Sequence, residues 1–108
     1  MSSLKPLLPA LFVALFFGQS DISNLTGFVI DYTSGAPIRG AEILVILKAD
    51  RSETKTTTDD RGDYNLLGLR PGSYTLVLTK PGLKPELRSF EIKKGDTVRR
   101  DFAMDKMQ

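Results

Sequence analysis

Few residue types in this chain could do chemistry, because the sequence contains neither histidine nor cysteine. That excludes Ser-His-Asp and Cys-His nucleophilic sites, ordinary zinc sites and two-histidine iron sites. What remains is a carboxylate cluster at Asp59, Asp60 and Asp63. We interpret it as turn capping and solvation. There are two alternatives. One is calcium binding by the same oxygens, although the sequence lacks the residue spacing of a calcium-binding loop. The other is catalysis by a pair of carboxylates. The sequence therefore predicts a protein that is not an enzyme and uses no cofactor or metal.

Two closely spaced turns are the strongest structural signals. Asp59-Asp60-Arg61-Gly62 predicts a type I turn, in which Asp59 accepts a hydrogen bond from the N–H two residues on and Gly62 is left-handed. Arg70-Pro71-Gly72-Ser73 predicts a type II turn, with φ > 0 at Gly72. We interpret both as hairpin connections, too short to join neighbouring strands of a parallel sheet. The same stretch spells Arg61-Gly62-Asp63, the integrin-recognition tripeptide, which we expect at an exposed tip but interpret as turn chemistry.

Short alternating segments between turn signals predict seven strands, and helical periodicity is absent. The expected strands are 24–31, 41–49, 54–58, 63–67, 73–80, 86–93 and 97–104. Seven short strands with frequent turns predict an all-β fold, a seven-stranded antiparallel β-sandwich with an aligned core. The expected core residues are Val29, Ala41, Ile43, Val45, Leu47, Tyr64, Leu66, Leu69, Tyr74, Leu76, Leu78, Phe90, Ile92, Val98, Phe102 and Met104.

The first twenty residues have the features of a secretory signal peptide. Lys5 precedes an apolar run from Leu7 to Phe17, and Gly18-Gln19-Ser20 offers small residues at a cleavage site. Alternatively, this segment is an uncleaved membrane anchor or a buried core helix. The protein would contact a membrane only if the segment is not cleaved. We expect a signal peptide at 1–20, one domain at 21–104 and a frayed end at 105–108. The predicted location is secreted, periplasmic or extracellular. A formal net charge of +2 does not indicate nucleic-acid binding.

Turn and core residues follow one another in three runs: Gly27-x-Val29-x-Asp31, then Gly35-x-Pro37-Ile38-x-Gly40-Ala41-x-Ile43, then Thr58-Asp59-x-x-Gly62-x-Tyr64-x-Leu66-x-x-Leu69-x-Pro71-Gly72-x-Tyr74-x-Leu76. In this order, from about Leu25 to Phe102, the sequence resembles the carboxypeptidase regulatory-like domain family. The resemblance implies a transthyretin-like (prealbumin-like) sandwich of Greek-key type. It also implies a non-catalytic accessory role.

Four apolar residues on the first two expected strands should point outward: Phe28, Ile30, Leu44 and Ile46. If those strands are neighbours, the four side chains form one contiguous patch, and such patches mark interfaces. We expect this patch to dock an unidentified protein partner or a second copy of the chain. The alternatives are that the N-terminal segment or a loop covers it, or that one strand is twisted the other way.

Tyr32, Arg39 and Lys84 fall in loops that we expect at one end of the sandwich, where binding residues are common. This end is the candidate for carbohydrate, although the sequence has no tryptophan for sugar stacking. The favoured function is a secreted, non-catalytic module for protein–protein interaction or structure. The alternatives are a carbohydrate- or cell-surface-binding module and an accessory subunit of a separately encoded enzyme or receptor.

Overall fold

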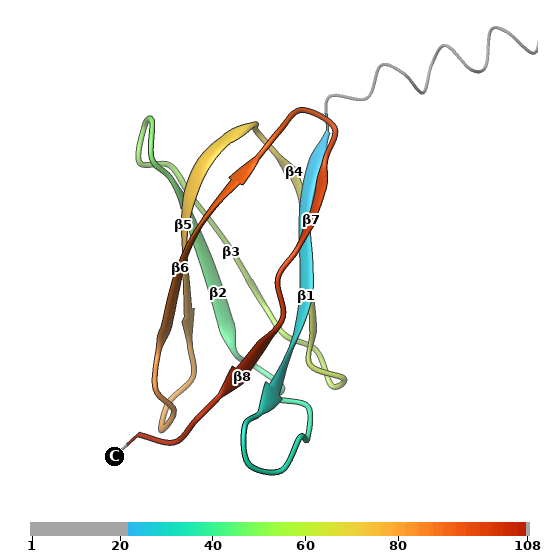
Figure 1. Ribbon diagram of the computed structural model, residues 1–108, viewed down its shortest axis with the longest axis vertical. Helices are drawn as coiled ribbons and strands as arrows, with labels where there is room; N and C mark the ends of the chain where they lie inside the picture. The colour runs from blue at the N-terminus through green and yellow to red at the C-terminus, as the bar shows by residue number, and fades with distance from the viewer. Residues whose placement is uncertain (1–21, 108) are drawn as a thin grey trace, which may run out of the picture.

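The computed structural model describes residues 22–107 as two β-sheets packed face to face (Figure 1), which confirms the predicted all-β sandwich. The strands are β1 (Ser23–Asp31), β2 (Glu42–Leu47), β3 (Glu53–Thr57), β4 (Asp63–Leu69), β5 (Gly72–Thr79), β6 (Glu86–Ile92), β7 (Thr97–Arg99) and β8 (Phe102–Met104). Within the same residues, no helix is long and apolar enough to cross a membrane. The expected signal peptide at 1–20 lies outside the described residues.

One sheet has the order β3-β2-β5-β6, and β1 lies at the centre of the other, between β4 and the pair β7 and β8. The expected seventh strand is therefore two short strands, interrupted at Arg100 and Asp101. Both pair with β1 in parallel, whereas every other strand pair is antiparallel, as expected. At the interruption the Arg100 N–H still donates to the Thr26 carbonyl (2.8 Å), so the chain stays attached to β1.

The two turns recognised in the sequence do not close hairpins, and that expectation is wrong. The turn at 59–62 carries the chain from β3 in one sheet to β4 in the other, and the turn at 70–73 carries it back to β5. Asp59 and Gly62 do adopt the expected turn, with Gly62 at φ 79° and its N–H bonded to the Asp59 carbonyl (2.9 Å). Gly72 sits at φ 150°, beyond the type II value, because β5 begins there. The hairpins of this fold are β2–β3 and β5–β6.

The core lies between the inner faces of the two sheets. All the expected core residues are buried except Val98, which is half-buried on the short strand β7 and packs against the core. Leu25 and Ile38 are also buried, although they were not among the expected core residues. Residues 105–107, which we expected to fray, are instead tied to the β5–β6 turn. Lys84 N–H donates to the Asp105 carbonyl (2.8 Å), and Met107 N–H donates to the Gly82 carbonyl (3.2 Å).

Candidate interaction surfaces

The four apolar residues expected to form one patch are divided between opposite outer faces of the sandwich. Phe28, Ile30, Leu44 and Ile46 are all half-buried and point outward, as expected from strand alternation. However, β1 and β2 belong to different sheets. The single contiguous patch is therefore wrong, because neighbours along the chain need not pair in space.

A different apolar surface exists on the outer face of the β3-β2-β5-β6 sheet. The strand register places Leu44 of β2 beside Val77 of β5, and Val77 beside Leu87 of β6. Ile46 lies two residues along β2 from Leu44, on the same face, so we call Leu44, Ile46, Val77 and Leu87 the apolar strip. Leu87 is 60% exposed, and the other three are half-buried. Val77 and Leu87 were not among the residues expected at an interface, although their spacing from the buried residues of β5 and β6 places them on an outer face.

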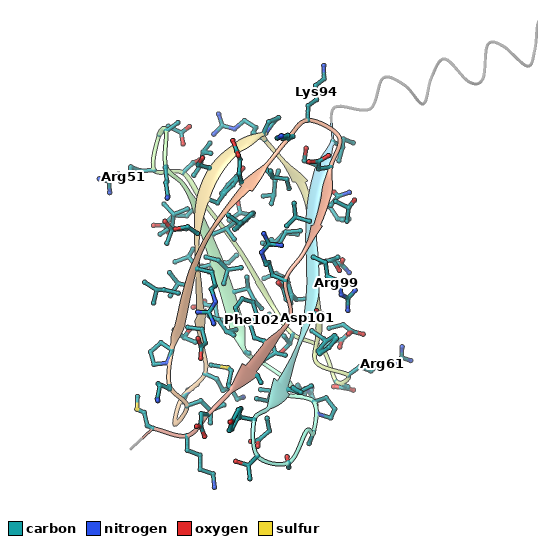
Figure 2. The ribbon with its side chains drawn as sticks, viewed as in Figure 1. Arg51, Arg61, Lys94, Arg99, Asp101 and Phe102 are labelled. Atoms are coloured by element: carbon teal, nitrogen blue, oxygen red, sulfur yellow. The ribbon has the colours of Figure 1, made fainter. Side chains whose placement is uncertain are left out.

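Two cations lie at one end of the apolar strip, where β2 turns into β3. The Lys48 ammonium is 3.4 Å from the Ser89 hydroxyl oxygen, on this outer face. Lys48 and Arg51 line a hollow of about 300 Å³ together with Ile46 and Thr75. Figure 2 shows the Arg51 side chain projecting from the hairpin into solvent.

The nearby carboxylate Asp50 is already engaged. The Arg70 guanidinium (2.7 Å) and the Ser52 hydroxyl (2.7 Å) both donate to it, and these contacts, Arg70 first, hold the pKa of Asp50 well below its usual value. Within the described residues, neither Lys48 nor Arg51 has a carboxylate within ion-pair distance. Neither cation at this end of the strip is therefore ion-paired, although the strand register places Glu53 and Glu91 at the same end of this outer face.

On the opposite sheet, the apolar side chains of Phe28 and Ile30 contact neighbouring residues. The Arg99 guanidinium lies 5.3 Å from the centre of the Phe28 ring and pairs with Asp101 at 3.0 Å (Figure 2). Asp101 also accepts a hydrogen bond from the Phe28 N–H (2.9 Å). Ile30 forms a β-bridge with Pro37 from the following loop. Leu67, on β4 of the same sheet, is 72% exposed.

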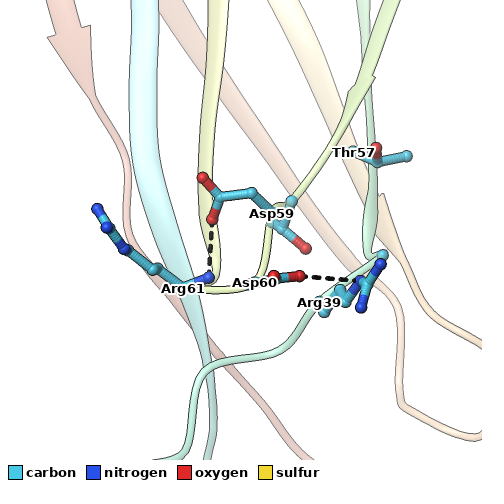
Figure 3. Close-up of a pocket in the computed structure, with 7 residues that line it drawn as sticks. Arg39, Thr57, Asp59, Asp60 and Arg61 are labelled. Carbon is cyan, nitrogen blue, oxygen red and sulfur yellow. Dashed lines mark hydrogen bonds and ion pairs between the residues drawn. The ribbon is translucent and has the colours of Figure 1, made fainter.

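Tyr32, Arg39 and Lys84 do lie in loops at the same end of the sandwich (Figure 1), with Tyr32 67% exposed. A polar pocket of about 680 Å³ lies at this end, between residues 39–40 and 57–61 (Figure 3). Arg39 lines it and pairs with Asp60 at 3.1 Å. Neither Tyr32 nor Lys84 lines the pocket. The structure thus gathers the three residues at one end without uniting them in one site.

Buried Thr58 holds the two pocket loops together. Its hydroxyl donates to the Ile38 carbonyl (2.6 Å) and accepts from the Ala41 N–H (2.9 Å). Two backbone hydrogen bonds join the same segments, from Gly40 N–H to the Thr58 carbonyl and from Thr58 N–H to the Ala41 carbonyl, each 3.0 Å. Hydrogen bonds within the protein therefore hold the two pocket loops in position.

The carboxylate cluster has the structural role that the sequence predicted. Asp59 accepts hydrogen bonds from the N–H groups of Asp63 and Arg61, each 2.9 Å, and these bonds lower its pKa. Asp60 pairs with Arg39. In residues 22–107, no three acidic side chains gather closely enough to suit a metal ion. Gly62 is buried, and its carbonyl accepts from the Val29 N–H (2.8 Å). Arg61 and Asp63 are exposed, as expected for the tripeptide, whereas its central glycine is packed against β1.

Comparison with known proteins gives consistent matches over this domain. The family model of the carboxypeptidase regulatory-like domain matches residues 24–105. Bacillopeptidase F of Bacillus subtilis (strain 168) is 35% identical over 76 residues, which is 70% of this chain and 5% of that protein. The TonB-dependent transporter Oar of Myxococcus xanthus is 33% identical over 84 residues, which is 77% of this chain and 8% of that protein. The chain thus spans less than a tenth of either relative's length.

Among solved structures, the Bacillus anthracis TIE protein is similar, with a TM-score of 0.67 and 25% identity over 80% of this chain and 17% of that one. GBS52, the minor pilin of Streptococcus agalactiae, has a TM-score of 0.62 and 20% identity over 82% of this chain and 45% of that one. The 3-chlorocatechol 1,2-dioxygenase of Rhodococcus opacus 1CP has a TM-score of 0.64 and 13% identity over 82% of this chain and 61% of that one. The likenesses to GBS52 and to the dioxygenase show the fold alone.

Proposed function

The chain belongs to the carboxypeptidase regulatory-like domain family, and from that premise we propose that it is an exported, non-catalytic β-sandwich module acting through protein–protein contacts. The observation that carries this proposal is the apolar strip of Leu44, Ile46, Val77 and Leu87 on one outer sheet face. Fully burying one such side chain contributes roughly 1.5–3 kcal/mol. Contiguous apolar surface of this kind marks interaction sites.

Three further observations support the non-catalytic and exported parts of the proposal. The sequence lacks histidine and cysteine, the residues that most nucleophilic and metal-dependent enzymes use. The apolar run from Leu7 to Phe17 supports export. One relative is a TonB-dependent transporter, which favours a place at the cell surface.

Site-specific crosslinking tests the proposed face. A photo-reactive amino acid replaces Leu87 on the apolar strip, and in a matched variant it replaces Leu67, which is 72% exposed on β4 of the other sheet. After irradiation of cells that produce the protein, the Leu87 variant should give a discrete adduct with a partner or with a second copy. The Leu67 variant should give none. Adducts from both positions, or from neither, would contradict the proposal.

Carbohydrate or cell-surface binding at the loop end is the second candidate, and the polar pocket favours it. Arg39, Thr57, Asp59 and Asp60 offer hydrogen-bond donors and acceptors on loops that Thr58 holds in place. No aromatic side chain lines this pocket, so stacking against a sugar ring is missing. Binding of the full chain to a glycan array, lost in the Arg39→Ala variant and kept in Leu87→Lys, would favour this candidate over the first.

A further inference from the structure

We propose that this domain carries mechanical tension between its two ends, through the contact of β1 with β7 and β8. Of the described strands β1 is the first and β8 the last, and the two run parallel, side by side. The described chain begins at one end of the sandwich and finishes at the opposite end (Figure 1). A pull on the two ends therefore slides β1 along its neighbours and strains their hydrogen bonds together. Such a role goes beyond the proposed function and does not depend on the apolar strip.

Hydrogen bonds join β1 to the end of the chain along the whole length of the strand. At the start of β1, the Ser23 hydroxyl donates to the Lys93 carbonyl (2.9 Å) and accepts from the Gly95 N–H (3.1 Å), just before β7. β7 then pairs with residues 24–26, and β8 pairs with residues 29–31. Because the bonds of a parallel pair are evenly spaced along the strands, they share a force that acts along β1.

Side chains bridge the gap between β7 and β8. The Asp101 carboxylate accepts a hydrogen bond from the Phe28 N–H (2.9 Å), where a strand carbonyl would otherwise be needed. A bond of this charge-assisted kind is stronger than one between neutral groups. The Arg99 guanidinium pairs with the same carboxylate at 3.0 Å and lies over the Phe28 ring. The Arg100 N–H donates to the Thr26 carbonyl (2.8 Å). The break in the strand therefore does not interrupt its attachment to β1.

The other sheet also holds the segment formed by β7 and β8. The Arg100 guanidinium lies 6.0 Å from the centre of the Phe90 ring on β6. In the opposite direction, the Arg88 guanidinium of β6 lies 5.5 Å from the centre of the Phe102 ring on β8. Both rings are buried in the core. Because a guanidinium over an aromatic face is attracted to it, these two contacts keep the segment in place while it is pulled along β1.

Single-molecule force spectroscopy of the full chain tests the proposal. Because the sequence has no cysteine, a pair of introduced cysteines fixes the two points of attachment. In the first geometry, Ile22→Cys with Met107→Cys, both at exposed residues, slides β1 along β7 and β8. In the second, Ile22→Cys with Lys94→Cys pulls apart the neighbouring starts of β1 and β7, so that their bonds break one after another. Unfolding in the first geometry should require about twofold or more force, since the bonds of the parallel pair then share the load.

Variants in the first geometry separate mechanical resistance from equilibrium stability, because forced unfolding depends on the unfolding barrier. Asp101→Ala should lower the unfolding force, since the Phe28 N–H loses its partner, whereas Asp101→Asn keeps an acceptor oxygen and should retain most of it. Thr58→Val removes hydrogen bonds outside the contact of β1 with β7 and β8, so it should lower the urea midpoint and leave the force unchanged. Equal forces in the two geometries, or equal losses of force in Thr58→Val and Asp101→Ala, would overturn the mechanical role. The protein–protein contacts of the proposed function would stand in either case.

Discussion

The phenolic oxygen of Tyr64 donates a 2.6 Å hydrogen bond to the carbonyl oxygen of Arg100. Gly27 is the strand partner of Tyr64, and a Cβ on Gly27 would clash with both that carbonyl and the Tyr64 ring. Burial, with a smaller effect of Asp101, raises the pKa of Tyr64 well above its usual range. This contact accounts for the break between β7 and β8, because the Arg100 carbonyl bonds to a side chain instead of to a strand.

Tyr64→Phe should remove this hydrogen bond and leave the Arg100 carbonyl without its side-chain donor. An intramolecular hydrogen bond of this kind contributes about 0.5–1.5 kcal/mol, and we expect the free energy of unfolding to fall by about that amount. Urea denaturation followed by circular dichroism measures the change. Tyr32→Phe, at a largely exposed tyrosine, is the control and should change stability by less than about 0.5 kcal/mol. Equal effects of the two variants would contradict the structural role of the contact.

Gly27→Ala should destabilise the protein by more than about 2 kcal/mol, because the new methyl group meets the Arg100 backbone. Gly35→Ala is the matched control. It puts a Cβ at φ 77° in open space, so only backbone strain of about 1 kcal/mol applies. Thermal unfolding of the two Gly→Ala variants compares the destabilisation caused by a steric clash with that caused by backbone strain alone. A Gly27 variant as stable as the Gly35 variant would show that β7 and β8 can move away from β1.

Thr58→Val should cost about 2 kcal/mol of unfolding free energy, because the Ala41 N–H and the Ile38 carbonyl each lose a partner. Thr57→Val removes a hydroxyl from the exposed neighbouring residue and should be within about 0.5 kcal/mol of the wild type. Chemical denaturation measures both. If Thr58→Val proves neutral, Thr58 does not hold the pocket loops together.

Protonation of Asp59 should weaken the fold at acid pH. The pKa of Asp59 is lowered in the folded state from its usual value of about 3.9. At pH values between the lowered and the usual pKa, Asp59 therefore binds more protons in the unfolded chain than in the folded protein. Stability from this group is therefore complete above that pH and is lost as the pH falls through the lowered pKa. Asp59→Asn keeps an acceptor oxygen but does not titrate.

The stability difference between wild type and Asp59→Asn should shrink as the pH drops from 7 to about 2, as measured by urea midpoints. Glu53→Gln is the control, since its side chain makes no hydrogen bond or ion pair to other described residues. A difference for Asp59→Asn that is the same at every pH would contradict the role of the ionised carboxylate.

Arg88 should protect an open sheet edge. In the described residues β6 has β5 as its one neighbouring strand, and the Arg88 guanidinium lies 5.5 Å from the centre of the Phe102 ring. Charged side chains at such edges prevent pairing with another chain. Arg88→Val should therefore increase self-association in sedimentation velocity. Arg61→Val, at a loop tip, should remain like the wild type, and a monomeric Arg88→Val would contradict the protective role.

The sequence by itself determined where the strands lie, which side chains face the core and where the chain turns. These are local properties, since alternation follows from the pleat and Asp59 and Gly62 act on their own backbone. The carboxylate cluster was interpreted correctly for the same reason: the N–H groups that bond to Asp59 lie within four residues of it.

Only the tertiary structure decided which strands are neighbours. Leu44 and Ile30 alternate equally well in the sequence, yet they lie on opposite outer faces, and Leu44 meets Val77 and Leu87 instead. A turn fixes a reversal of the chain but not the sheet that the next strand joins. That choice depends on packing between residues far apart in the sequence, such as Tyr64 against Arg100, which no local pattern contains.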